Sequence, residues 1–213
     1  MKTEDLIALI GRDAAPVPRA SLPARLGVFG LVVLVLALIV LLVWLGVRPD
    51  LASALHTSAY WMKTIYTTGL AIAGFALVER LSRPGASARL GAVLLGACIA
   101  VIAAIAVIQL YSAPATDMTK ELLGSTWDRC PWRILALSLP GLVAVLLAMR
   151  RFAPTRPALA GAAAGLFVGG LSATVYGLYC QETAAPFVAI WYSLGVGLSG
   201  LLGAATGHRA LRW

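Results

Sequence analysis

Two of the three cysteines in this 213-residue chain are the side chains best suited to chemistry. Cys130 lies near the end of a polar loop, within the aromatic-rich stretch Trp127-Asp-Arg-Cys-Pro-Trp132. Cys180 is the first residue of a second polar stretch, Cys180-Gln-Glu182. Two such thiols in an oxidising compartment form a structural disulfide, or act as a sensing pair that responds to oxidation or to a soft metal ion. A third alternative is that the two thiols never meet. The sequence alone leaves all three open.

The charged residues beside these cysteines act on the thiols in opposite directions. Arg129 and Arg133 would lower the pKa of a neighbouring thiol, because a positive charge favours the thiolate. Asp128 and Glu182 would oppose that effect, or would join the thiolates in a metal site. The third cysteine, Cys98, lies well inside a long apolar run, where a thiol stays protonated. We expect Cys98 to be an inert packing residue.

The sequence holds no recognisable motif for enzyme catalysis. It lacks the phosphate-binding G-x-x-x-x-G-K-[ST], the zinc-binding H-E-x-x-H, the nucleophile elbow G-x-S-x-G and the redox motif C-x-x-C. His56 and His208 fall on opposite sides of the membrane in the topology derived below, so they cannot share a site. We therefore predict that the protein is not an enzyme. We expect no cofactor, apart from a soft metal that Cys130 and Cys180 could hold.

The elements that carry these residues are predicted to be membrane-spanning helices. Hydrophobic residues make up 60% of the chain and charged residues only 12%, whereas about a quarter of the residues in soluble domains are charged. Six apolar runs are long enough to cross a bilayer: 26–47, 59–78, 90–110, 134–149, 158–179 and 187–206. This pattern predicts an all-α membrane protein with a six-helix bundle over residues 26–207. Lys63 lies near the start of the second run, and we expect it to reach back to the membrane surface.

The cationic residues predict the orientation of this bundle. Of the 17 Lys and Arg residues, all but Arg48, Lys63, Lys120, Arg129 and Arg133 lie on the side that holds both termini. Because cytoplasmic segments carry the excess of Lys and Arg, we expect a cytoplasmic segment 1–25, a cytoplasmic tail 208–213 and an outward-facing cysteine pair. The formal charge of +8 is then a topology signal, and we expect no direct binding of nucleic acid.

Two stripes of small residues predict close contacts between helices. The fifth run contains Gly161, Gly165 and Gly169, and the sixth contains Gly195, Ser199, Gly203 and Gly207. Small residues at this spacing let two helix backbones approach closely. The stripes predict packing within the bundle or, as an alternative, contact between two copies in a homodimer.

The N-terminal segment contains a short amphipathic pattern. Residues 3–11 are predicted to form a helix that Thr3 caps and Gly11 ends. Leu6, Leu9 and Ile10 share one face of this helix. A helix this short is marginal on its own, so its apolar face needs a partner surface. The candidates are the membrane lipid, the inner ends of the bundle and the groove of a partner protein.

Several stretches resemble one known family: Met1–Ile10, Val47–Leu51, Tyr60–Lys63, Ala153–Gly165 and Leu211–Trp213. They look like the NrsF family, whose members are six-span inner-membrane negative regulators of extracytoplasmic-function (ECF) sigma factors. The family's two outward-facing cysteines fall on Cys130, in a Trp-x-x-Cys context, and on Cys180, in Leu-Tyr-Cys. The family commonly has Leu-His-Cys at the second position. Tyr179 replaces that histidine here, which argues against a metal-ligand role for the position.

The resemblance implies an anti-sigma factor in the bacterial inner membrane that holds a cytoplasmic ECF sigma factor. It would release the sigma factor when envelope, redox or heavy-metal stress acts on Cys130 and Cys180. The residues assigned to sigma binding are Leu6, Ile7, Leu9 and Ile10, and those assigned to cytoplasmic docking are Arg80, Arg83, Arg150 and Arg151.

Two other functions are compatible with a six-span chain. A small-solute transporter or channel is disfavoured by the lack of intramembrane carboxylates and of inverted repeats. A thiol oxidoreductase is disfavoured by the missing C-x-x-C motif.

Overall fold

The computed structural model describes residues 3–4, 21–83, 85–114, 117–150 and 154–211, and every regular element in these ranges is a helix. Within them, six helical stretches are long and apolar enough to cross a membrane. They are α2 (Ser21–Trp44), α4 (Ser58–Leu81), α5 (Arg89–Ser112), α7 (Cys130–Met149), α8 (Pro157–Tyr176), and α9 (Ala185–Phe187) continued by the π-helical η2 (Val188–Tyr192) and α10 (Ser193–Ala210). The predicted all-α fold with six spans is confirmed, and the chain is a multi-pass membrane protein.

The helix boundaries differ from the hydropathy runs where local backbone chemistry overrides composition. The first span ends at Trp44 rather than at residue 47, because Gly46 adopts a left-handed conformation with φ of 78° that terminates the helix. The fourth span begins at Cys130, four residues before the predicted start, because Pro131 suits the first turn of a helix. Cys130 therefore belongs to the helix and is not the end of a loop.

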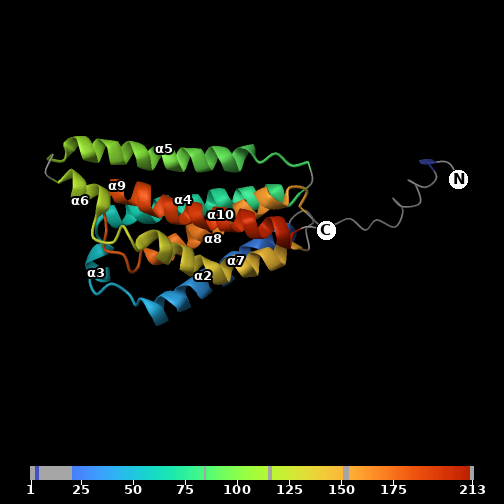
Figure 1. Ribbon diagram of the computed structural model, residues 1–213, viewed down its shortest axis with the longest axis horizontal. Coiled ribbons are helices and arrows are strands. Elements are labelled where there is room, and N and C mark those ends of the chain that lie inside the picture. The colour runs from blue at the N-terminus through green and yellow to red at the C-terminus, as the bar shows by residue number, and fades with distance from the viewer. Residues whose placement is uncertain (1–2, 5–20, 84, 115–116, 151–153, 212–213) are drawn as a thin grey trace.

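Helix α8 lies at the centre of the bundle. It packs against α10, α4, α7 and α2, and it is the most buried of the six spans. In contrast, α5 lies at one edge of the bundle and contacts mainly α4 and α9 (Figure 1). Since the spans alternate in direction, α7 begins and α8 ends at the same end of the bundle, together with the short helices α3 (Leu51–Ala54) and α6 (Met118–Leu123). We call this the cysteine end.

The closest helix contact joins α8 to α10 through the predicted small-residue stripes. A Cβ atom added at Gly161 or Gly203 would overlap the carbonyl oxygen of the other residue. A Cβ at Gly165 would likewise overlap the carbonyl oxygen of Ser199. The two stripes therefore pack against each other within one chain. They are not available as the surface of a homodimer, so that alternative for these faces is wrong.

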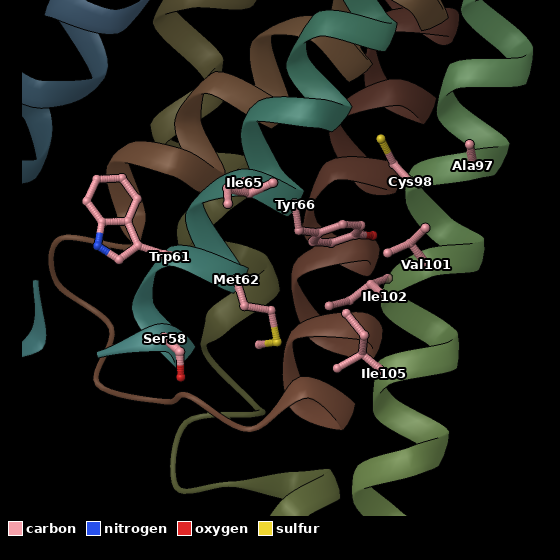
Figure 2. A pocket seen from close by; sticks show the side chains of 10 residues that line it. All are labelled: Ser58, Trp61, Met62, Ile65, Tyr66, Ala97, Cys98, Val101, Ile102 and Ile105. Atoms are coloured by element: carbon pink, nitrogen blue, oxygen red, sulfur yellow. The ribbon is translucent and has the colours of Figure 1, made fainter. Parts of the chain in front are cut away.

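A groove of about 560 Å³ separates α4 from α5 near the cysteine end (Figure 2). Its walls are almost entirely apolar, and Figure 2 shows Met62 and Tyr66 on α4 facing Ile102 and Ile105 on α5. Cys98 lies half-buried on the same wall, as expected for a packing residue in an apolar setting.

We predict that Gly203→Ala destabilises the folded protein, because the added methyl group must push α8 and α10 apart. Forcing an extra methyl into a tight contact costs about 1–3 kcal/mol of unfolding free energy. Gly197→Ala on the same helix is the matched control, because a Cβ there meets nothing within 4 Å. Thermal unfolding of both variants in detergent measures the difference. Equal melting temperatures would contradict the assigned contact.

Candidate functional site

The structure brings Cys130 and Cys180 together. Cys130 opens α7, and Cys180 follows the end of α8, so both lie at the cysteine end, where these helices adjoin. Their side chains are 0% and 2% exposed. The two cysteines belong to one buried cluster, their thiols interact electrostatically, and they are not joined by a disulfide. The alternative in which the two cysteines never meet is excluded.

Lys63 is buried beside this pair. Its side chain is only 1% exposed, so the expectation that it reaches back to the membrane surface is wrong. The Lys63 Nζ donates hydrogen bonds to the carbonyl oxygens of Cys180 at 2.8 Å and of Glu182 at 3.0 Å. Lys63 lies on the face of α4 that packs against α8, which turns the side chain into the protein rather than toward the lipid.

Arg48 reaches the same carbonyl group from the connection after α2. Its Nη1 lies 3.4 Å from the carbonyl oxygen of Cys180, and its backbone N–H donates to the carbonyl of Leu178 at 3.1 Å. The guanidinium is held in a fork by Asp50, with bonds of 2.7 and 2.6 Å. This fork holds the pKa of the Asp50 carboxyl below its usual range, since it favours the carboxylate. Asp50 therefore holds the Arg48 guanidinium in the orientation that points it at the Cys180 carbonyl.

Two tyrosines complete the surroundings of the thiols. Tyr176 and Tyr192 are fully buried, and their ring centroids are 5.7 Å apart. Neither hydroxyl has a hydrogen-bond partner of good geometry in the described part of the chain, although both interact electrostatically with the two cysteines. The Lys63 Nζ lies 5.7 Å from the centre of the Tyr192 ring. The thiols thus lie in the buried interior together with one ammonium group and two phenols.

The charged residues next to the cysteines in sequence are directed elsewhere. Arg129 pairs with Asp128 at 3.4 Å on the surface. Arg133 donates to the hydroxyl of Tyr179 at 3.2 Å and lies over its ring. The Glu182 carboxylate accepts bonds from the backbone N–H and the hydroxyl of Ser125, at 2.7 and 2.6 Å. The side-chain charges of Arg129, Asp128 and Glu182 therefore do not set the pKa of the thiols as the sequence suggested. Residues farther away in the sequence do so instead.

The pKa of the Cys180 thiol lies below its usual range. A hydrogen bond from Cys130 is the main cause, and the positive charge of Lys63 adds to it, while burial acts in the opposite direction. A thiolate is the nucleophilic form of cysteine, so Cys180 is the better nucleophile for attack on an oxidant or electrophile. Chemically, the arrangement allows the pair to pass reversibly between a dithiol and a disulfide.

The structure gives little support to a multi-ligand metal centre. In the ranges described, no group of three or more His, Cys, Asp or Glu side chains is placed to hold a metal ion. A soft metal bound at Cys130 and Cys180 would have to rely on the two sulfur atoms as its main protein ligands.

Other predicted residues lie at the opposite end of the bundle or outside the description. Arg83 forms an ion pair with Glu79 at 2.9 Å, and the Arg150 Nε donates to the carbonyl of Ala210 at 3.1 Å. Arg80 lies at the end of α4, at this same end of the bundle. The remaining site residues, Leu6, Ile7, Leu9, Ile10 and Arg151, lie outside the described residues, as does most of the predicted helix 3–11.

Sequence reasoning missed Lys63, Arg48, Tyr176 and Tyr192 as parts of the site. One signal was available for Lys63, because an ionisable residue within an apolar span marks a functional site by default. Arg48 lies in the family motif Val47–Leu51 and Tyr176 lies one helical turn before Cys180, but neither fact by itself showed a contact with the thiol pair, and nothing in the sequence pattern pointed to Tyr192.

The fold and the site define a six-span helical membrane protein with a buried thiol pair at one end. Comparison with known proteins identifies the family. Residues 10–213 match the family described as "NrsF: Negative regulator of sigma F". The chain is 45% identical to the "Anti-sigma-F factor NrsF" of Caulobacter vibrioides (strain NA1000 / CB15N) and 40% identical to the "Probable anti-sigma-F factor NrsF" of Azospira oryzae (strain ATCC BAA-33 / DSM 13638 / PS), with both members of each pair covered in full.

The chain therefore belongs to the NrsF family, as its sequence motifs indicated. This is a family of regulators, so the prediction that the protein is not an enzyme is confirmed. No solved structure matches the chain.

We predict that mild oxidation joins Cys130 to Cys180 within one chain. The azo compound diamide takes up two electrons and the two thiol protons, and both cysteines lie in one buried cluster at the cysteine end of the bundle. Counting thiols with a maleimide-polyethylene glycol reagent after denaturation should show a fall from three to one, with Cys98 remaining. In Cys98→Ala, none should remain. Cross-linked dimers in place of this pattern would contradict the pairing.

Proposed function

We propose that this protein is a membrane-embedded anti-sigma factor that sequesters an ECF sigma factor and releases it under stress. The observation that carries the proposal is full-length similarity to two relatives that are named as anti-sigma-F factors. The buried thiol pair adds a chemical feature through which such a protein can respond to its surroundings.

The proposed setting is the bacterial inner membrane, with both termini in the cytoplasm. The bias of Lys and Arg toward the side of the termini supports this orientation. The cysteine end then faces the oxidising compartment, where a thiol pair can change state. The lipid of this membrane covers the exposed apolar faces of α2 and α5.

The proposed sigma-binding element is segment 1–25, with contacts from Leu6, Ile7, Leu9 and Ile10. Its apolar stripe supports this role, because a marginal amphipathic helix gains stability by burial in a partner's groove. Four further residues are proposed to contact the sigma factor at the cytoplasmic end of the bundle: Arg80, Arg83, Arg150 and Arg151. Arg150, His208 and Arg209 line a hollow at this end of the bundle, which supports contact with an acidic surface.

The proposed sensor is the pair Cys130 and Cys180. A two-electron oxidant of the azo or quinone class would accept the two electrons and two protons that the thiols give up as the disulfide forms. A soft heavy metal that binds both sulfurs is a second input to the same pair. Moving a sigma factor from almost fully bound to almost fully free takes about 5.5 kcal/mol of coupling.

Deleting residues 2–11 should free the sigma factor, because it removes the apolar stripe of the clamp. The measurement is the share of sigma factor that sediments with membrane vesicles when both proteins are produced together. A matched control replaces Lys2 and Arg12 by Gln, which leaves the stripe intact and should retain the sigma factor. Full retention by the deletion variant would show that the clamp lies elsewhere.

Cys130→Ser and Cys180→Ser should each blunt release under oxidising stress, because neither variant can form the intramolecular disulfide. Cys98→Ser is the control and should respond like the natural protein. A reporter gene read by the sigma factor gives the response, measured with and without diamide. If both single variants respond fully, the pair is not the sensor.

A further inference from the structure

Two buried cations hold the main chain at Cys180. Its carbonyl oxygen accepts hydrogen bonds from Lys63 at 2.8 Å and from Arg48 at 3.4 Å. Two further bonds flank it, from Lys63 to the Glu182 carbonyl at 3.0 Å and from the Arg48 backbone to the Leu178 carbonyl at 3.1 Å. The segment 178–182 is thus fastened at the three alternate positions 178, 180 and 182, each through its backbone carbonyl.

These bonds connect the cysteine segment to two different helices. Lys63 belongs to α4, whereas Arg48 follows the end of α2 at Trp44 by only a short connection. The bonds therefore lead from one carbonyl group to two separate parts of the bundle. A displacement of the Cys180 peptide cannot leave all four of them unchanged.

Lys63 depends strongly on these acceptors. It is almost fully buried, and its hydrogen bonds in the described structure go to carbonyl oxygens. A buried charge that loses its partners is costly, so the ammonium group must follow the carbonyl groups or find other acceptors. The carbonyl of Cys180 and the side chain of Lys63 therefore move together.

Helix α2 is suited to carry such a movement along the membrane normal. Among its described side chains, only the single stripe Val33, Ala37 and Leu41 is buried. Its 24 residues span about 36 Å, so it runs from residue 21 at one end of the bundle to Trp44, shortly before Arg48 at the cysteine end. Residue 21 lies within segment 1–25, to which we assign sigma binding, so α2 begins inside that segment. A rigid helix that is held on one narrow stripe can shift as a unit.

We propose that Lys63 and Arg48 are positioning residues that couple the state of the Cys130–Cys180 pair to α2, and through α2 to the sigma-binding segment. This inference rests on the proposed function. When diamide oxidises the pair, each sulfur loses its proton, one sulfur–sulfur bond forms, and the N=N bond of diamide is reduced to a hydrazine. The new bond draws Cys180 toward α7. Lys63 and Arg48 follow the Cys180 carbonyl through their hydrogen bonds, and the end of α2 moves with Arg48.

Coupling of this kind is reciprocal. If oxidation weakens sigma binding by a given factor, bound sigma factor must oppose oxidation by the same factor. In the natural protein, bound sigma factor should therefore raise the glutathione disulfide level needed to oxidise half of the pair, by about the 10⁴-fold in equilibrium constant that nearly full release requires. This shift reports the coupling itself, which a residue with a purely structural role would not control.

The test compares Lys63→Met with Lys120→Met in membrane vesicles that contain the full-length protein, with and without sigma factor. Lys120 carries the matched change on a side chain that is 84% exposed. The first measurement is the glutathione titration of the Cys130–Cys180 disulfide, and the second is the sigma factor released on oxidation. We expect Lys63→Met to form the disulfide but to lose both this shift in the titration and the release. Lys120→Met should keep both.

The outcomes separate this inference from the proposed function. If the natural protein shows neither the shift nor the release, the sensor proposal fails before Lys63 is considered. If the natural protein shows both and Lys63→Met shows them undiminished, the coupling role is overturned. Should Lys63→Met fail to reach the membrane intact, Arg48→Met decides the question by the same two measurements, because it removes the side-chain bond from residue 48 to the Cys180 carbonyl from outside the membrane-spanning helices.

Discussion

The contact between α8 and α10 positions most of the other elements. Glycines at Gly161 and Gly203 bring the two backbones so close that neither position has room for a side chain. With α10 on one side, α8 has its other faces free for α4, α7 and α2, and it becomes the centre of the bundle. The end of α8 is thereby fixed against the start of α7. The meeting of Cys130 and Cys180 is a consequence of this packing.

The cysteine end combines groups that are costly to bury separately. An ammonium group in a low-dielectric interior requires acceptors, and Lys63 finds them in carbonyl oxygens of the segment after α8. Those carbonyls lie beyond the last regular turn of the helix, where backbone acceptors lack partners of their own. The Lys63 ammonium group and the carbonyl groups after α8 therefore satisfy each other's need for a hydrogen-bond partner. The thiols, whose sulfur atoms are polarizable, share the same pocket.

The protein separates a tightly packed interior from lightly held outer helices. Most of the surface of α2 and α5 is apolar and exposed to lipid. In the proposed function, the rigid part holds the thiol pair in place, and α2 joins the cysteine end to the segment that binds the sigma factor. A device that responds to a small chemical change needs both parts, because a uniformly rigid bundle has no second arrangement to adopt.

The sequence by itself determined the membrane class, the six spans and the family, because run length, composition and motif order are properties of the chain in one dimension. It also set Cys130 and Cys180 apart from Cys98, since both flank predicted spans while Cys98 lies within one. The helix boundaries were less accurate where Gly46 and Pro131 act locally on the backbone.

Only the tertiary structure decided that the two cysteines lie in one buried cluster, that Lys63 turns inward and that Arg48 reaches Cys180. Each of these depends on how a helix is rotated about its axis and which neighbour it faces. The rotation of each helix and the neighbour it faces are set by close packing between residues far apart in sequence, such as Gly161 and Gly203. The hydropathy pattern does not contain this information.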